Sequence, residues 1–284
     1  MGDEDAVGRL RGCLLAGAAG DALGANLEFD DLAAIRRRFG PAGLTAADGY
    51  PSGQWPAGAV TDDTQMTLFT GEGLLRALVR GREKGIVHPP TMLWHAYLRW
   101  LHTQGVAWEA MAATPVGRDG WLLAEPRLYA PLNGSKGCGG VMRAAPAAVA
   151  GLLRGQALPD AATAARAELG THAGHEEVAA AVDAAARVAA TGWPLSPETI
   201  EGLGGGWVAE EALAIALACA LAAPDLHAGL LAAVNHGGDS DSTAAIAGNL
   251  LGAAMGAAAV PAELPVRRRR LAPAGSRVPG LTMV

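Results

Sequence analysis

Two clusters of carboxylate and hydroxyl side chains carry the residue types that divalent cations prefer. One cluster is Thr61-Asp62-Asp63-Thr64, and the other is Asp239-Ser240-Asp241-Ser242-Thr243. Mg²⁺, Mn²⁺ and Ca²⁺ take oxygen ligands of this kind. A simpler interpretation is that one residue of each cluster caps a helix. One cap needs only one such residue, however, and adjacent carboxylates repel each other unless a cation or hydrogen bonds compensate. The first cluster therefore favours a metal site.

A third segment combines glycines with polar residues in the manner of an anion-binding loop. It runs from Asn133 to Arg143, contains four glycines and precedes a predicted helix. Backbone N–H groups in such a segment can point at a phosphate. The residue order of a P-loop and the strand-flanked pattern of a dinucleotide-binding fold are both absent. Cys138, within the segment, is interpreted as a small buried thiol because no histidine neighbours it in the sequence.

Two single residues are candidates for proton transfer or ligand contact. Glu28 lies between apolar residues shortly after the Gly-rich stretch Gly20–Gly24, so it is either a general acid or base or an ordinary surface residue. His172 follows Thr171, a plausible helix cap. It would contact a ligand only if that helix end faces a pocket.

Helices are predicted to position these residues. The pattern of apolar residues predicts a first helix over about 5–19, ending in a tight bend at Gly20–Gly24. Further helices are expected to begin at Thr61, Thr171 and Asp225, and to cover 90–101, 152–168 and 207–222. Residues 40–59 are expected to form a long surface loop, and 114–132 an irregular segment.

Composition supports a helical protein with a large core. Half of the 284 residues are apolar, Ala and Gly are abundant, and only 5% are aromatic. Small side chains suit closely packed helices better than a β-sandwich. The apolar stretch Ala244–Val260 approaches the length of a membrane span, but Asn249 and the aspartates before it favour a buried central helix. We expect an all-α, compact single-domain orthogonal helical bundle over residues 1–284, with a flexible tail from about 265.

Net charge and cysteine content indicate which classes of partner and which cellular compartment to expect. The formal net charge of −6 opposes general affinity for nucleic acid. The run Arg267–Arg270 is interpreted as a solvated tail, with a nucleic-acid contact as the alternative. Three cysteines cannot pair completely, and the acidic first residues do not resemble a signal peptide. These features predict a cytoplasmic protein without a membrane span, and we expect a monomer.

Taken in chain order, five blocks resemble the ADP-ribosylglycohydrolase family, which includes hydrolases of ADP-ribosylated arginine and serine. The blocks are Gly17–Gly24 with Glu28, Thr61–Met66, Asn133–Arg143, Thr171-His172 and Gly237–Ser242. Together they extend over nearly the whole chain. The segment Lys136-Gly137-Cys138 makes the third block longer than in some relatives.

The resemblance implies a compact all-α fold with a cleft that holds a binuclear Mg²⁺ (or Mn²⁺) centre. It assigns the metal ligands to Thr61, Asp62, Asp63, Asp239, Asp241 and Ser242. Ser242 stands where the family commonly has threonine, and Thr243 is expected to be structural. The resemblance assigns the diphosphate subsite to Asn133, Gly134, Ser135, Gly139, Gly140 and His172. It makes Glu28 the acid or base and gives Asp62 and Asp241 catalytic roles beside it.

The implied activity is magnesium-dependent hydrolysis at C1″ of ADP-ribose attached to protein, at Arg or Ser. Three alternatives remain at this point. In the first, the substrate is ADP-ribosylated nucleic acid or a free ADP-ribose metabolite. In the second, the protein binds ADP-ribose without cleaving it, and in the third it is a Mg²⁺-dependent phosphohydrolase.

Overall fold

The computed structural model describes residues 3–109, 136–147 and 175–262. The helices in these ranges are α1 (Asp3–Gly24), α2 (Leu32–Phe39), α3 (Asp62–Lys84), α4 (Pro89–Thr103), α7 (Gly139–Met142), α10 (His175–Ala189), α11 (Pro197–Glu201), α12 (Ala209–Ala222), α13 (Leu226–Val234), α14 (Ser240–Met255) and the 3₁₀ turn η2 (Ala257–Ala259). No strand occurs in the described ranges, where one isolated bridge joins Gly137 and Val208. The all-α prediction is confirmed.

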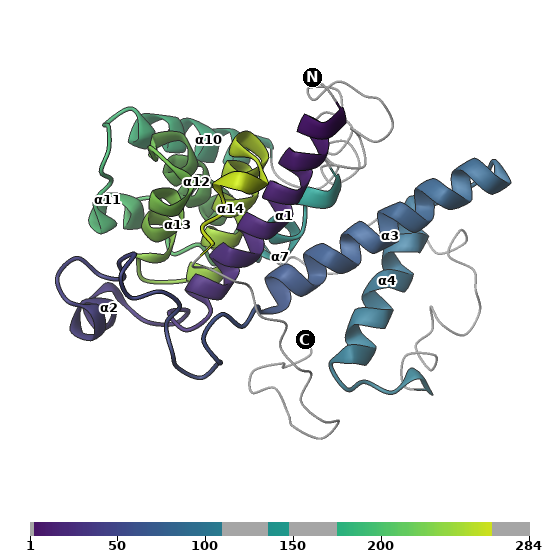
Figure 1. The fold of residues 1–284 in the computed structure, drawn as a ribbon, viewed down its shortest axis with the longest axis horizontal. Coiled ribbons are helices and arrows are strands. Elements are labelled where there is room, and N and C mark those ends of the chain that lie inside the picture. The colour runs from purple at the N-terminus through teal and green to yellow at the C-terminus, as the bar shows by residue number, and fades with distance from the viewer. Residues whose placement is uncertain (1–2, 110–135, 148–174, 263–284) are drawn as a thin grey trace.

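α14 is the buried central helix, and α1 packs along it (Figure 1). Glycines allow the two backbones to touch. A Cβ atom built on Gly20 would lie 2.1 Å from the carbonyl oxygen of Ala244, and one on Gly248 would lie 2.2 Å from that of Ala16. Any larger residue would force the helices apart. Small residues therefore set the spacing of this pair, as the sequence predicted.

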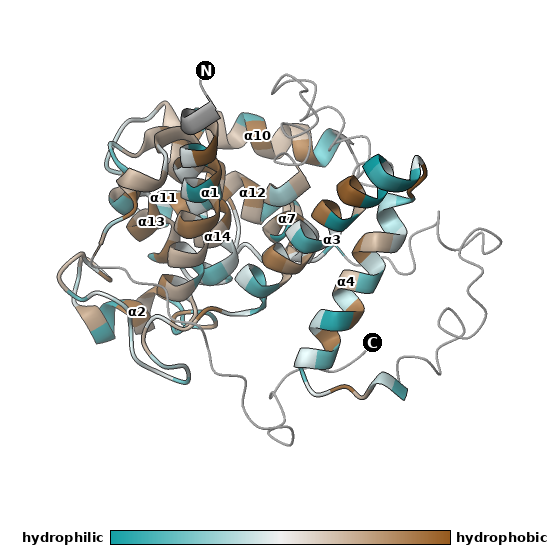
Figure 2. Ribbon diagram, turned by 45° about the vertical axis from the view of Figure 1, so that its right-hand side comes forward, coloured by the Kyte–Doolittle hydropathy of each residue, from teal (hydrophilic) through white to brown (hydrophobic). Residues whose placement is uncertain are grey.

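α10, α11, α12 and α13 lie on one side of the α1–α14 pair, and α3 and α4 lie on the other (Figure 1). Figure 2 shows hydrophilic and hydrophobic residues interspersed along α3 and α4. The core is formed mainly by residues of α1, α12, α13 and α14. Among the described helices, none has the length and apolar character needed to cross a bilayer.

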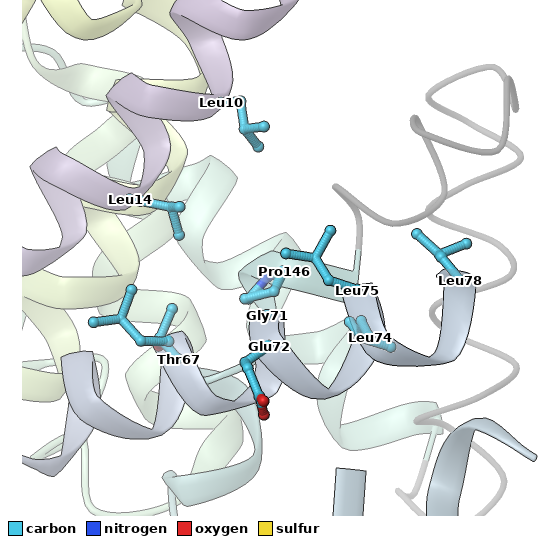
Figure 3. A pocket seen from close by; sticks show the side chains of 10 residues that line it. Leu10, Leu14, Thr67, Gly71, Glu72, Leu74, Leu75, Leu78 and Pro146 are labelled. Atoms are coloured by element: carbon cyan, nitrogen blue, oxygen red, sulfur yellow. The ribbon is translucent and has the colours of Figure 1, made fainter. Parts of the chain in front are cut away.

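α3 starts beside α1 and then diverges from it (Figure 1). An apolar pocket of about 300 Å³ lies between the two helices. Leu10 and Leu14 of α1 line one side of it, and Leu75 and Leu78 of α3 line the other (Figure 3). Most of its lining is aliphatic, with Thr67 and Glu72 at its edge, so it does not suit a highly charged ligand such as a diphosphate.

The structure differs from the sequence predictions at the ends of two helices. α1 does not bend at Gly20 but continues to Gly24. The glycines there serve close contact with α14 instead of a turn, since a Cβ on Gly24 would lie 2.3 Å from the backbone nitrogen of Asp241. α14 begins at Ser240, four residues before the apolar stretch, and ends at Met255. The short helices α2 and α11 were not predicted. Residues 114–132, 152–168 and 171–174 lie outside the described ranges.

Candidate metal centre and active site

The start of α14 presents carboxylates that do not cap the helix. Asp239 occupies the N-cap position, but its side chain makes no capping hydrogen bond. Its carboxylate instead accepts a hydrogen bond from the thiol of Cys138, with 2.9 Å between Oδ2 and Sγ. Its backbone N–H donates to the carbonyl oxygen of Gly205 at 2.8 Å. The capping interpretation is therefore wrong for the side chain of Asp239.

The start of α3 combines a hydroxyl cap with two carboxylates that are not needed for capping. Thr61 is the N-cap, and its hydroxyl accepts a hydrogen bond from the backbone N–H of Asp63 at 3.3 Å. Asp62 is exposed, whereas Asp63 is buried. One hydroxyl satisfies the cap, so neither carboxylate is needed for that purpose.

The two clusters meet through a direct hydrogen bond. The hydroxyl of Ser242 donates to Oδ1 of Asp63 at 2.8 Å. The neighbouring Thr243 points elsewhere: its hydroxyl lies 2.9 Å from the carbonyl oxygen of Ala233 and 2.9 Å from Nε2 of His236. Ser242 therefore faces the carboxylates, and Thr243 connects α14 to α13 through a hydrogen bond.

Glu28 joins the carboxylates of α14. Glu28, Asp239 and Asp241 each offer an oxygen within 4.8 Å of the others, a spacing that one cation could span. We call these three residues with Asp62 and Asp63 the acid group. Glu28 is partly buried and follows the end of α1, so it approaches the group from a separate segment.

The environment of the acid group raises the pKa of four of its carboxyls, those of Glu28, Asp62, Asp63 and Asp241. Burial raises the pKa of Asp63 and Asp241 well above the usual range, and the charges of neighbouring carboxylates raise it further. Burial also raises the pKa of Glu28 to about 7, with additional contributions from Asp239, Asp62 and Asp21. A bound cation would offset this repulsion and desolvation. The donor set and its electrostatics thus fit a divalent metal ion.

Asp21 holds the start of α3 in place, a role that the sequence analysis missed. This fully buried carboxylate accepts hydrogen bonds from the backbone N–H groups of Thr61 and Thr64, at 3.0 Å each. It also accepts from both threonine hydroxyls, that of Thr61 at 2.9 Å. Burial raises the pKa of Asp21 to about 6, although these hydrogen bonds lower it. Its only signal in the sequence was a lone carboxylate in a helix of small residues.

The glycine-rich segment lies beside the acid group. Cys138 precedes α7, and its thiol contacts Asp239 and lies 3.4 Å from the hydroxyl of Ser242. Burial, followed by the charge of Asp239, raises the pKa of this thiol, which disfavours a nucleophilic role. Lys136 forms ion pairs with Glu177 and Glu210.

A cavity of about 740 Å³ opens next to this segment. Gly139, Gly140, Tyr97 and Arg143 contribute to its lining. The guanidinium carbon of Arg143 lies 5.3 Å from the ring centre of Tyr97. Four predicted subsite residues, Asn133, Gly134, Ser135 and His172, lie outside the described ranges, as do Arg267–Arg270.

Comparisons with known proteins agree with this geometry. The sequence model of the family described as ADP-ribosylglycohydrolase matches residues 3–152 and 147–276. A solved structure titled "ADP-ribosylglycohydrolase-related protein complex" is similar at 29% identity, over 92% of each chain, with a TM-score of 0.59. A search of curated proteins gave no match.

Proposed function

Because this chain belongs to the ADP-ribosylglycohydrolase family and is thus a glycosyl hydrolase, we propose that it removes ADP-ribose from protein by magnesium-dependent hydrolysis at C1″. The acceptor would be an Arg or Ser side chain. The observation that carries the proposal is the convergence of the acid group, in which the two predicted ligand clusters and Glu28 come together.

The metal site would be shared between the starts of α3 and α14. Thr61, Asp62 and Asp63 would supply ligands from one helix, and Asp239, Asp241 and Ser242 from the other. Oxygen donors of this kind suit two Mg²⁺ ions, with Mn²⁺ as an alternative. When bound, the ions would polarise ribose hydroxyls or a water molecule. Asp62 and Asp241 would also orient the substrate through this site.

Glu28 would transfer the proton. Its pKa of about 7 allows both the protonated and the ionised form to be populated near neutral pH. Glycoside hydrolysis passes through an oxocarbenium-like state and needs a proton at the leaving atom or removed from the attacking water. Glu28 belongs to the acid group but comes from a separate segment, which suits this task.

The ADP portion would extend along the glycine-rich segment. Gly139 and Gly140, together with Asn133, Gly134, Ser135 and His172, would hold the diphosphate. The adjacent cavity of about 740 Å³ is of a size typical of ligand pockets. Tyr97 would offer its ring to the adenine.

Residues 1–284 would form one domain. Because all three cysteines are free thiols, we also propose a cytoplasmic location. We propose in addition that the protein is a monomer.

The test replaces one ligand while preserving its shape. Asp241→Asn should fold normally but lose hydrolysis by more than about 100-fold, because an amide binds Mg²⁺ poorly. Mass spectrometry would quantify free ADP-ribose released from ADP-ribosyl-arginine and ADP-ribosyl-serine peptides, with and without chelator. Asp225→Asn, which changes the exposed cap of α13, is the matched control and should retain activity.

Each alternative gives a different product pattern in the same assay. Release of inorganic phosphate would identify a phosphohydrolase. ADP-ribose binding without any cleavage would identify a binding protein. Cleavage only of ADP-ribosylated DNA or of a small metabolite would show that the substrate is not an ADP-ribosylated protein. Unchanged peptide turnover by Asp241→Asn would refute the assigned role of the acid group.

A further inference from the structure

Two exposed aromatic side chains stack against each other beside the acid group. The ring centres of Phe29 and Trp207 lie 5.3 Å apart, and the ring planes differ by 22°. Phe29 is 75% exposed and Trp207 is 43% exposed. Each ring therefore covers part of the other and leaves apolar surface open to solvent.

The backbone conformation of Phe29 is unfavourable, in addition to the exposure of both rings to solvent. The backbone of Phe29 has a φ of 72°, and it is the one non-glycine residue in the described ranges with a positive φ. Bulky residues rarely occupy this left-handed region. Backbone strain of this kind persists where the surroundings hold it, often at functional sites. Packing of the hydrophobic core explains neither the backbone strain of Phe29 nor the exposure of the two rings.

Both rings are fixed to segments of the acid group. Phe29 directly follows Glu28. The backbone of the Trp207 loop accepts two hydrogen bonds, from the N–H of Asp239 to Gly205 and from the N–H of Cys138 to Trp207 itself. The backbone N–H groups of Gly205 and Gly206 donate in turn to the carboxylate of Glu211, at 3.1 and 3.2 Å. The loop thus connects Trp207 to α14 and to the glycine-rich segment.

We propose that Phe29 and Trp207 form the leaving-group subsite and select a flat, cationic leaving group, the guanidinium of an arginine side chain. This inference rests on the proposed function and goes further by choosing between Arg and Ser. A guanidinium stacks on aromatic faces, whereas a serine side chain has no flat face to stack. Glu28, next to Phe29, adds the negative charge that a cation prefers.

The reaction at this subsite is a simple hydrolysis. The bond between C1″ and a guanidinium nitrogen breaks, and the nitrogen keeps the electron pair and gains a proton. The oxygen of water bonds to C1″ and loses a proton. The products are ADP-ribose and unmodified arginine, so no oxidant, reductant or second substrate is required.

The first experiment compares two peptides of identical sequence that carry ADP-ribose on arginine or on serine. Wild-type protein should cleave the arginine linkage with a kcat/KM about tenfold or more above that for serine. Trp207→Ala should lower kcat/KM for the arginine peptide about tenfold and change the serine value little. Trp207→Phe should restore most of the preference, because a ring returns.

Two further variants separate the ring from folding effects. Phe29→Asn removes the ring but keeps a residue that tolerates a positive φ, and it should reproduce the loss of preference. Trp108→Ala is the matched control, because Trp108 is 47% exposed and also stacks, on His102 at the end of α4. It should leave both rates unchanged.

The outcomes distinguish this inference from the proposed function. If wild-type protein cleaves neither peptide, the proposed function fails. If it cleaves serine as well as or better than arginine, or prefers ADP-ribosylated DNA, the inference fails and the glycosidic activity stands. Equal loss on both peptides in Trp207→Ala and Phe29→Asn would show a general structural role and would also overturn the inference.

Discussion

At the residue scale, the residues that could bind a metal were easier to predict than the residues that hold them in position. The two acid clusters could be recognised from residue type alone, and the structure places Ser242 rather than Thr243 against Asp63. Asp21 could not be recognised in this way. Its partners, Thr61 and Thr64, lie about 40 positions further along the chain, so its role depends on tertiary packing. The Phe29–Trp207 stack was missed for the same reason.

Removing the charge of Asp21 should weaken the metal site without replacing any ligand. In Asp21→Asn, one acceptor oxygen becomes an NH₂ group, which cannot accept the N–H and O–H donors of Thr64. The start of α3 would lose its fixed position, and Mg²⁺ affinity should fall by roughly 10–100-fold. Isothermal titration with Mg²⁺ and with Mn²⁺ would measure the change.

The control for Asp21 is Asp31→Asn, at the exposed cap of α2. Asparagine is an equally good cap, so metal affinity should not change. Equal affinity in Asp21→Asn and wild-type protein would show that Asp21 does not position the ligands.

At the element scale, periodicity located the long helices but not how they meet. α3, α4, α12 and α13 were predicted close to their observed positions. α2 and α11 have only eight and five residues, too few for a periodic pattern to be recognised. The glycines at the end of α1 suggested a bend, because local sequence does not distinguish a turn from close contact with another helix.

Two glycine substitutions test the contact between α1 and α14. Gly248→Ala places a methyl group against the backbone of Ala16 and should destabilise the fold by about 1–3 kcal/mol. Gly8→Ala, in α1 where nothing lies within 4 Å of the new atom, should instead stabilise by about 0.5–1 kcal/mol. Denaturant unfolding would measure both. Similar effects of the two changes would contradict close backbone packing.

At the scale of the whole molecule, the fold brings several carboxyl groups together in its interior. The all-α class followed from composition, because small residues favour closely packed helices. The convergence of three chain segments on the acid group did not follow from composition, because it depends on how α1, α3 and α14 pack together. The result is a set of carboxyls whose pKa values are raised, and this sets the dependence of stability on pH and on metal.

Stability without metal should fall as the pH rises. The folded state binds protons more tightly than the unfolded chain at Asp21 (pKa about 6) and Glu28 (pKa about 7), since the ordinary values are 3.8 and 4.5. Their contribution is complete below about pH 4 and is lost as the pH rises through about 7. In chelator, Tm should therefore be lower at about pH 8 than at about pH 5.

Added Mg²⁺ should reduce that loss, because it binds the ionised carboxylates of the folded state. Scanning calorimetry at both pH values, with chelator and with Mg²⁺, makes the comparison. Asp63→Asn is the matched variant and should show a smaller dependence on pH. A Tm that rises with pH in chelator would show that the folded state does not raise the pKa values of these carboxyls.

The backbone contact between α1 and α14 has a consequence for how this protein can change by mutation. The spacing of the acid group depends on positions such as Gly20 and Gly248, which have no side chain to vary. The stacked rings at Phe29 and Trp207 belong to segments outside both helices. The rings proposed to select the leaving group can therefore be varied without changing the glycine contact between α1 and α14, although Phe29 directly follows the proposed proton-transfer residue Glu28.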